Sequence, residues 1–507
     1  MPAATTPDRP PSLVCAPDRR TTPLPGSFTL HPAPATVHLD GGAVVLGGSP
    51  LRLFRISERA RTLLEWWRVG HPVGERRGVQ LLARRLVSSG AYVPRPTTPT
   101  FRKEDVTVVI PVRDRATGLD RLLAAVSDLA CVVVDDASVE AGATKEVAER
   151  HGARFVPLAD NAGPAGARDA GWAVVDTALV AFIDSDCVPS PGWLDPLLGH
   201  FDDPVVGAVA PRVVPLARTP RRALDRYERV RSSLDRGASE GPVRRGSPIS
   251  YVPSAALVVR VAVTTGPDLF DATLRGGEDV DLVWRLADAG WDVRYVPAST
   301  VEHDGPATLG EFLARRAFYG TSAAPLARRH PGALSPLHVS AWSFAVWLLA
   351  LARRPLLALT TLAASVGLLA HRLRGLTGDP VGVATRIAGD GTVRAAMPAL
   401  ASLARTGSPA LLVGLAFRRT RRAAALALLL PALADWWKDR GDLDPASYVA
   451  LHVADDVAYG AGVWLGCARE RTVAPLVPRL AFRARVWSAR SLRENLAPKG
   501  AAPTTPA

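Results

Sequence analysis

Residues 180–186 carry the sequence Val-Ala-Phe-Ile-Asp-Ser-Asp, an apolar run that ends in two acids. Such a run is typical of a buried strand. Because side chains alternate along an extended chain, Asp184 and Asp186 are expected to lie on the same side and to face one cation. Carboxylate oxygens suit Mg²⁺ or Mn²⁺, which in turn holds a diphosphate. Two solvated acids in a turn are the alternative, and the position at a strand end favours the metal site.

Strands and helices alternate around this stretch, which predicts a doubly wound α/β domain over residues 105–330. Residues 106–112 form a nearly continuous β-branched run, as in a parallel strand buried on both faces, and Pro111 marks its end. Further strands are expected at 131–134, 154–157 and 179–183, and helices at 119–129, 145–151 and 166–175.

Two more groups follow strand ends, where open α/β sheets bind ligands. The first strand lacks the glycine pattern of dinucleotide-binding folds, which disfavours a nicotinamide enzyme. The second strand ends at Asp135 and Asp136. The Asp136 carboxylate can accept hydrogen bonds from a uracil N–H or a ribose hydroxyl, and a helix N-cap formed by Asp136 or Ser138 is an equal alternative.

Glycines bracket the start of a predicted helix in residues 161–171. The free N–H groups at such a helix start attract anions. Arg168, in the first turns of this helix, is therefore expected to meet a base or a phosphate. A surface arginine on an amphipathic helix explains the same pattern equally well.

Glu278 and Asp279 begin another predicted helix, and His303 follows an apolar strand. Acids at a helix N-terminus are stabilised by the helix dipole, which is sufficient to explain the pair by itself. His303 is either a structural histidine or a third ligand that completes a metal site.

The motifs occur in a fixed order between residues 106 and 303: V-V-I-P, V-V-D-D-A-S, N-A-G-P-A-G-A-R, I-D-S-D, G-G-E-D-V-D-L and V-E-H. This ordered set resembles glycosyltransferase family 2, whose members have the GT-A fold for nucleotide-diphosphate sugars. The resemblance implies that the donor nucleotide sugar, with UDP-glucose expected, contacts Pro111, Asp136, Arg168, Asp184 and Asp186. It further implies a Mn²⁺ or Mg²⁺ ion held by Asp186 and His303 with Asp184.

The same resemblance implies an inverting mechanism, in which Asp279 is the base and Glu278 positions it. Processive synthases of the family carry a Q-x-x-R-W motif after the acidic pair. Here the corresponding stretch begins Arg315-Arg316-Ala317-Phe318-Tyr319, so a cellulose- or chitin-type synthase is not expected.

The segment before the transferase domain predicts a small winged-helix-like α+β domain over residues 27–94, followed by a Pro/Thr-rich linker at 95–104. A hairpin is expected from 36–39 and 43–46, with helices at 57–69 and 78–89. The domain is similar to peptide-binding domains of the pyrroloquinoline-quinone D type. Fused ahead of a family-2 transferase, it implies β-glucosylation of a peptide-derived redox cofactor, or of its precursor peptide, with several sugars in series. A generic domain without a peptide role is the alternative.

Residues 331–470 contain apolar runs at 339–352, 355–370, 411–417 and 423–434. Each is shorter than the roughly 18–20 residues that span a bilayer, so buried or interfacial helices are expected. Flanking arginines also fit docking on an anionic membrane surface. Residues 1–26 are expected to be a disordered tail, and residues 471–507 a C-terminal tail that is frayed after Arg490.

Composition narrows the function classes. The net charge is +13, yet the arginines are scattered and no basic run contains interleaved aromatics, so no nucleic-acid partner is expected. The four cysteines show no C-x-x-C spacing, and residues 1–26 lack a signal-peptide core, which indicates a cytoplasmic protein, with the inner face of the membrane as a further location. Two rival functions remain: a transferase acting on cell-wall or lipid-linked saccharides, and a non-catalytic peptide-binding scaffold.

Overall fold

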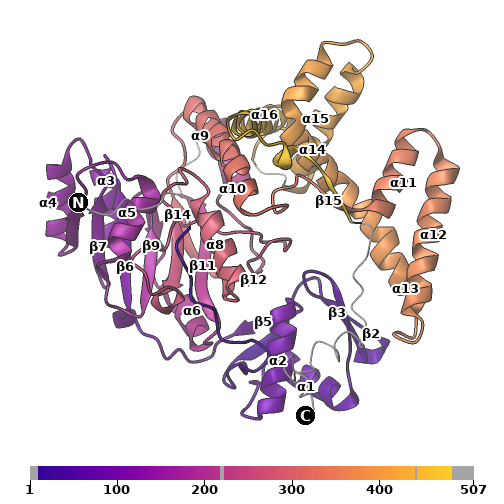
Figure 1. Cartoon of the computed structure of the whole chain (residues 1–507), viewed down its shortest axis with the longest axis horizontal. Helices are drawn as coiled ribbons and strands as arrows, with labels where there is room; N and C mark the ends of the chain where they lie inside the picture. Colours follow the sequence, from indigo (N-terminus) through magenta and orange to yellow (C-terminus); the bar gives the residue numbers. More distant parts are fainter. Residues whose placement is uncertain (1–9, 217–221, 440–441, 482–507) are drawn as a thin grey trace, which may run out of the picture.

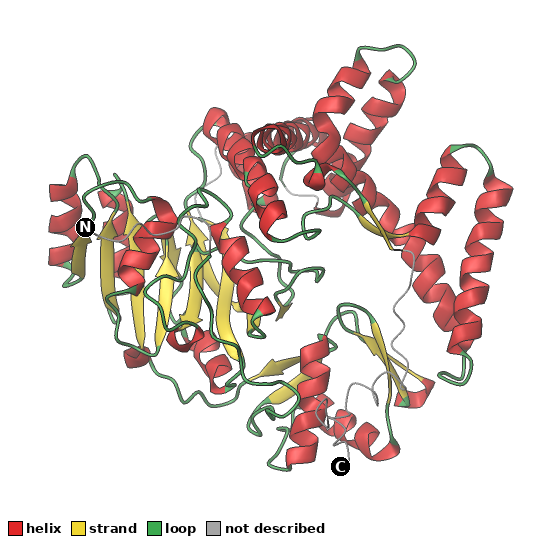
Figure 2. Ribbon diagram, in the orientation of Figure 1, coloured by secondary structure: helices red, strands yellow, loops and turns green. Residues whose placement is uncertain are grey.

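The computed structural model describes residues 10–216, 222–439 and 442–481. Figure 1 shows three parts in chain order: a small N-terminal domain, a larger domain built on one sheet, and a group of C-terminal helices. In Figure 2 the strands of the larger domain form one continuous layer with helices around it.

Within the described residues, nine strands form the central sheet, in the order β10-β14-β11-β13-β9-β6-β7-β8, with β12 paired to β14. The strands are β6 Val106–Val112, β7 Ala130–Asp135, β8 Arg154–Pro157, β9 Leu179–Ile183, β10 Cys187–Pro189, β11 Val206–Pro215, β12 Gly241–Pro242, β13 Ala256–Arg260 and β14 Asp292–His303.

The sheet is mixed, whereas the sequence predicted a parallel arrangement; β11 and β14 are parallel to each other. Strands β8, β7, β6 and β9 are parallel, but β13 runs antiparallel to both β9 and β11. The expectation of a doubly wound sheet came from residues 106–183, where a helix joins each pair of strands. Strand β10 follows β9 after a tight turn but pairs with β14, and the place beside β9 is taken by β13 in the antiparallel direction.

Two apolar cores lie on the two faces of the sheet, and both contain side chains from the parallel strands. Ile110 and Ile183 belong to one core, while Val109 and Phe182 belong to the other. The surrounding helices are α3 Ala116–Ala125, α4 Ala141–Arg150, α5 Gly163–Trp172, α6 Asp195–Leu198, α7 Ala223–Arg231, α8 Glu278–Asp288, α9 Leu309–Thr321 and α10 Ala323–Arg329. Because β6 and β9 are buried on both faces, their ends form a rigid base for the side chains that follow them.

The N-terminal domain contains the predicted hairpin and two helices. Its elements are β1 Thr29–Pro32, β2 Val37–Leu39, β3 Val44–Gly47, β4 Arg52–Arg55, α1 Glu58–Arg68, α2 Arg77–Ser89 and β5 Tyr92–Arg95. Strands β2, β3 and β4 form one small sheet, while β1 pairs with β5. Ser57 caps α1 by accepting a hydrogen bond from Ala60 N (3.3 Å), as the sequence predicted. The domain has its own core around Trp67 and Leu86.

The segment 10–26 differs from the disordered tail expected there. Its backbone is fixed to the transferase domain, because Val14 N donates to Val263 O (2.8 Å) and Ala16 N to Ala289 O (2.9 Å). Trp291 Nε1 donates to Val14 O (2.8 Å), and Leu24 is fully buried. Apolar residues spaced among prolines are enough to anchor this extended strand-like segment, although they show no periodicity. Residues 1–9 lie outside the described residues.

The C-terminal region is helical, and α12, α14 and α15 are longer than the apolar runs suggested, whereas α11 is shorter than its run. The elements are β15 His338–Ser340, α11 Ala341–Leu351, α12 Pro355–Leu373, α13 Pro380–Ala384, α14 Gly391–Leu415, α15 Arg421–Asp439, α16 Pro445–Arg469 and β16 Arg479–Ala481. Helix α12 has 19 residues, because it continues past the apolar run through His371 and Arg372. By length and composition it alone, among the described helices, is long and apolar enough to cross a membrane.

The C-terminal helices touch both other parts of the protein. The end of α12 and α13 pack on the sheet of the N-terminal domain, where Leu373 and Val383 meet Leu46. Helix α16 lies along α9 of the transferase domain, and the two backbones approach closely at Gly320 and Gly462. This second contact closes one side of the site described next. Strand β16 pairs with β15, so residues 479–481 of the predicted C-terminal tail are ordered. Residues 482–507 lie outside the described chain.

Candidate active site

The turn after β9 carries two of the predicted metal ligands. Cys187 N donates to the Asp184 carbonyl (2.9 Å), so the chain turns here instead of continuing extended. Asp184 consequently accepts a hydrogen bond from Arg168 Nη2 (2.6 Å), whereas Asp186 Oδ1 lies 3.5 Å from His303 Nε2. Asp184 and Asp186 thus have different protein partners, but both line one cavity, and the expectation that both carboxylates face one cation stays a prediction.

Asp186 and His303 remain the pair that suits a cation. Strands β10 and β14 bring them together, since Cys187 and His303 are paired in register. Burial lowers the pKa of His303, which keeps the imidazole neutral and able to bind a metal. In the described part of the chain, no three carboxylate, imidazole or thiol groups gather as a metal cluster. The two side chains fit Mg²⁺ or Mn²⁺ only if substrate phosphates and water supply further ligands, as is usual for Mg²⁺.

Asp136 holds the start of α5 in place. Its carboxylate accepts hydrogen bonds from Ala162 N (2.6 Å) and Gly163 N (3.0 Å). Asp136 thus satisfies free N–H groups at the start of a helix, as predicted for an N-cap. The helix is α5, which follows the neighbouring strand β8, and not α4, which follows the strand that precedes Asp136. Asp135 instead accepts from Ser138 N (3.3 Å) and from the Ser138 hydroxyl. The predicted base contact of Asp136 would have to be made by an oxygen already engaged in these bonds.

Arg168 is buried, so the alternative of a surface arginine is wrong, and its contact with a base or phosphate stays a prediction. The side chain is only 3% exposed and connects two acidic motifs: Nη2 donates to Asp184 (2.6 Å) and Nη1 donates to Glu278 (3.0 Å). Its guanidinium also lies over the Phe270 ring, 5.5 Å from the centroid. Arg168 therefore fixes the turn after β9 against the first turn of α8.

Glu278 and Asp279 begin α8 behind Gly277, which adopts the left-handed conformation (φ 81°) that favours glycine. The Asp279 carboxylate accepts hydrogen bonds from Val280 N (2.7 Å) and Ser254 N (3.3 Å). Burial, together with the neighbouring Glu278 charge, raises the pKa of Asp279 to about 7. A carboxylate with such a pKa can take a proton from a hydroxyl at neutral pH.

A cavity of about 630 Å³ at the strand ends brings the predicted donor residues together, and we call it the donor cavity. Its lining includes all five of them: Pro111, Asp136, Arg168, Asp184 and Asp186. The sequence reasoning missed three further arginines in this lining, Arg113, Arg115 and Arg275. Arg115 Nη1 lies 3.4 Å from Asp186. The sequence Val-Arg-Asp-Arg directly after β6 was the available signal for two of them, since cations at a strand end suit a diphosphate.

A second cavity, of about 480 Å³, lies on the other side of Arg168 and Asp184, and we call it the acceptor cavity. Its lining includes Glu278, Asp279 and His303. Arg168 and Asp184 line both cavities. The predicted base and the predicted donor residues thus face two adjoining spaces across one ion pair.

Two adjoining cavities thus lie at the ends of the parallel strands, one rich in arginine and one lined by the Glu278–Asp279 pair, an arrangement that suits a transferase for an anionic donor. Residues 107–260 match the family described as Glycosyl transferase family 2. Over 475 residues, the chain is 40% identical to "Pre-mycofactocin glycosyltransferase" of Mycobacterium tuberculosis, in strains CDC 1551 and H37Rv. That alignment covers 90% of this chain and 99% of the relative. The chain belongs to glycosyltransferase family 2 and has the GT-A fold.

Solved glycosyltransferase structures resemble the chain only loosely. The mannosyltransferase PcManGT from Pyrobaculum calidifontis, in complex with GDP-Man and Mn²⁺, is 18% identical, with a TM-score of 0.36, over 68% of this chain and 91% of that one. TarS 1–349 of S. aureus is 16% identical, with a TM-score of 0.32, over 43% of this chain and 65% of that one. At these identities and TM-scores, residue roles cannot be transferred from the solved structures to this chain.

Proposed function

We propose that the chain is an inverting hexosyltransferase that uses a nucleotide-diphosphate sugar. The observation that carries the proposal is the pair of cavities separated by Arg168 and Asp184, with Asp279 on the acceptor side. A donor in one cavity and an acceptor in the other would meet at this boundary. Holding two reactants in that way replaces a bimolecular encounter with an oriented one.

The reaction is one displacement. Asp279 removes the proton of an acceptor hydroxyl, and the oxygen forms a bond to the anomeric carbon. The bond from that carbon to the diphosphate oxygen breaks on the opposite face, and the electron pair leaves with the diphosphate. An α-linked donor therefore gives a β-glycoside, and no covalent enzyme intermediate is required.

Arginine side chains of this protein would stabilise the negative charge that develops on the leaving diphosphate. Arg113, Arg115 and Arg275 line the donor cavity, and fixed cations at this position favour the separating anion. Asp186 and His303 would hold a Mn²⁺ or Mg²⁺ ion, which supplies further positive charge to the diphosphate when bound. Arg168 keeps Asp184 and Glu278 in position for both partners.

The donor is proposed to be UDP-glucose and the acceptor pre-mycofactocin, a peptide-derived redox cofactor, with several sugars added in series. The name of the 40% identical relative supports this acceptor. The N-terminal domain is proposed to bind the peptide portion or its precursor. A transferase for lipid-linked saccharides remains the second candidate, because the exposed apolar helices described below favour a membrane surface. A non-catalytic peptide-binding scaffold is disfavoured, because such a function does not require two adjoining cavities in the transferase domain.

The first test is donor binding and slow donor hydrolysis across a panel of UDP- and GDP-hexoses, with and without Mg²⁺ or Mn²⁺. We expect one UDP-hexose to be preferred and removal of the metal to lower hydrolysis by at least tenfold. His303→Ala should reproduce the loss in the presence of metal, whereas His71→Ala, in the N-terminal domain, should not. Absence of binding for every nucleotide sugar would refute the transferase proposal and leave the scaffold.

The protein is further proposed to be cytoplasmic and to dock on the inner membrane face. Two helix hairpins, α11–α12 and α14–α15, project in the same direction in Figure 1. Apolar residues flank each tip, including Leu351 (82% exposed) and Leu356 (77%) at one and Phe417 (60%) at the other. The tips themselves carry exposed arginines: Arg353, Arg354, Arg418, Arg419, Arg421 and Arg422. Apolar side chains with adjacent arginines are suited to the headgroup region of an anionic bilayer.

Vesicle flotation tests this docking. We expect the full chain to float with vesicles made of equal parts phosphatidylcholine and phosphatidylglycerol, to remain unbound with phosphatidylcholine alone, and to dissociate in high salt. Changing Arg418, Arg419, Arg421 and Arg422 to Glu should abolish flotation. The same change at Arg55, Arg59, Arg68 and Arg76, exposed in the N-terminal domain, should leave it intact. Equal flotation of the two variants would refute docking through the hairpin tips.

A further inference from the structure

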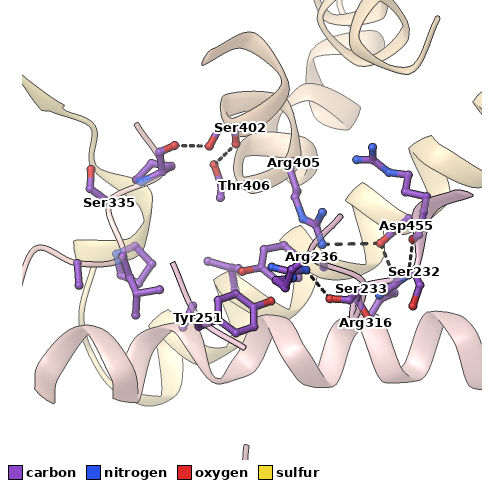
Figure 3. A pocket seen from close by; sticks show the side chains of 18 residues that line it. Ser232, Ser233, Arg236, Tyr251, Arg316, Ser335, Ser402, Arg405, Thr406 and Asp455 are labelled. Carbon is purple, nitrogen blue, oxygen red and sulfur yellow. Dashed lines mark hydrogen bonds and ion pairs between the residues drawn. The ribbon is translucent and has the colours of Figure 1, made fainter. Parts of the chain in front are cut away.

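A third cavity, of about 450 Å³, lies between the transferase domain and the C-terminal helices, and we call it the helix-side cavity. Figure 3 shows it with Arg405 and Thr406 of α14 on one side and Tyr251 on the other. Its lining also includes Arg236, from the loop after α7, and Tyr459, from α16. No residue implied by the family resemblance lies in it.

The helix-side cavity continues the acceptor cavity. Tyr251, Arg405 and Tyr459 line both spaces, together with Ser233, Ala323, Ala333 and Leu334. An acceptor whose hydroxyl reaches Asp279 therefore has room to extend away from the donor into this second space. The C-terminal helices supply much of its wall, so it exists only in the complete chain.

The charges around the helix-side cavity are largely paired. Arg316 Nε lies 3.1 Å from Asp455, and Arg316 Nη2 donates to Glu228 (2.7 Å). Arg231 Nη1 donates to Asp435 (2.5 Å). Because guanidinium charges are offset by nearby carboxylates, the cavity does not have the unbalanced positive field that a phosphate or carboxylate ligand would favour.

Two guanidiniums of the lining are stacked on tyrosine rings, and one of them, Arg405, also lies 3.9 Å from Asp455 and from Asp456. Arg236 lies 4.6 Å from the Tyr251 centroid and Arg405 lies 4.1 Å from the Tyr459 centroid. The Nε of Arg236 is buried and donates no hydrogen bond within the described structure. Hydroxyl side chains complete the polar lining: Ser232, Ser233, Ser335, Ser402 and Thr406.

This combination suits an uncharged ligand with many hydroxyl groups. Fixed guanidinium N–H groups donate to neighbouring hydroxyl oxygens, and aromatic rings pack against C–H faces. The Ser335, Ser402 and Thr406 hydroxyls donate to backbone carbonyls, so they can accept hydrogen bonds from a sugar's hydroxyl groups. We infer that the helix-side cavity is a saccharide subsite, which binds a sugar portion of the acceptor remote from the reacting hydroxyl. The inference rests on the proposed function, because it places the acceptor's attacking group at Asp279.

Saturation-transfer NMR of the full chain tests the subsite with free disaccharides as probes: cellobiose, laminaribiose, gentiobiose and maltose. We expect at least one to bind without any donor present. Thr406→Trp, which fills the cavity, should abolish the signal. Leu403→Trp, an exposed position on the same helix, should retain it. Arg236→Gln should weaken binding roughly tenfold, as expected for losing a hydrogen bond to a charged group. Circular dichroism and UDP binding verify that each variant is folded.

Three outcomes would overturn the inference: no disaccharide binds, Thr406→Trp and Leu403→Trp bind equally well, or inorganic tripolyphosphate binds at this cavity in preference to the sugars. Failure of the proposed function gives a different pattern, in which the unsubstituted chain binds no nucleotide sugar. Because the disaccharide signal is measured without donor, the two failures are distinguishable.

Discussion

Replacing Asp279 with Asn is expected to lower turnover by about 10²–10⁴-fold, the usual contribution of a positioned base. The amide has nearly the same shape as the carboxylate but cannot accept the acceptor's proton. Asp279 lies outside the lining of the donor cavity, so affinity for the nucleotide sugar should change little. The measurement is steady-state release of UDP beside UDP binding by calorimetry. Asp268→Asn, at an exposed position outside the described cavities, should retain full turnover.

The pH dependence provides an independent test of the same base. Burial and the Glu278 charge raise the pKa of Asp279 to about 7. The active form is the ionised carboxylate, so log kcat/KM should rise with unit slope below pH 7 and level off above it. Glu278→Gln removes the like charge, which should lower the pKa of Asp279 and move the rising limb to lower pH. A profile identical to that of the unsubstituted chain, or full turnover by Asp279→Asn, would mean that another group is the base.

Local patterns were sufficient to predict the framework of this site. The strand expected at 179–183 has the bounds of β9, because a short apolar run buried on both faces leaves a clear signal. The five predicted donor residues line one cavity for a related reason: groups that follow parallel strands meet at one edge of the sheet. Spacing could not predict the side-chain partners: Asp184 accepts a hydrogen bond from Arg168, whereas Asp186 lies beside His303.

The parts that could not be predicted depend on contacts between distant segments. Arg168 and Glu278 are far apart in the sequence, so the buried pair that they form gives no periodic signal, and a surface arginine was an equal interpretation. Residues 10–16 pack against the transferase domain through backbone hydrogen bonds, which any sequence can supply. The role of α14 and α16 in closing a cavity beside Asp279 could not be predicted, because none of the apolar runs falls in α16 and only the run at 411–417 reaches into α14.

The attachment of the N-terminal domain yields the largest expected effect on stability. Asp203, in the transferase domain, is fully buried and accepts hydrogen bonds from Arg84 Nη2 (2.6 Å) and Arg84 Nη1 (2.7 Å) of α2. Arg294 of β14 donates to the same carboxylate. Asp203→Asn would leave the two buried guanidiniums with only the Asp292 carboxylate, which lies 4.0 Å from Arg84 and 3.8 Å from Arg294. We expect it to lower the free energy of unfolding by about 3–5 kcal/mol, as measured for broken buried ion pairs.

Thermal melting monitored by circular dichroism, together with limited proteolysis of the linker at 96–104, measures this loss. The matched control is Asp128→Asn, which breaks the exposed pair with Lys103 and should leave the midpoint unchanged.

Burial opposes ionisation of Asp203, but Arg294 and Arg84 outweigh it and lower its pKa. The carboxylate therefore stabilises the fold above about pH 4, the ordinary value for Asp, and this contribution is lost as the pH falls further. Asp203→Asn should consequently differ most from the unsubstituted chain near neutral pH. Equal melting midpoints for Asp203→Asn and the unsubstituted chain at pH 7 would contradict this prediction. They would show that apolar contacts hold the two domains together and that the buried ion pair does not stabilise the fold.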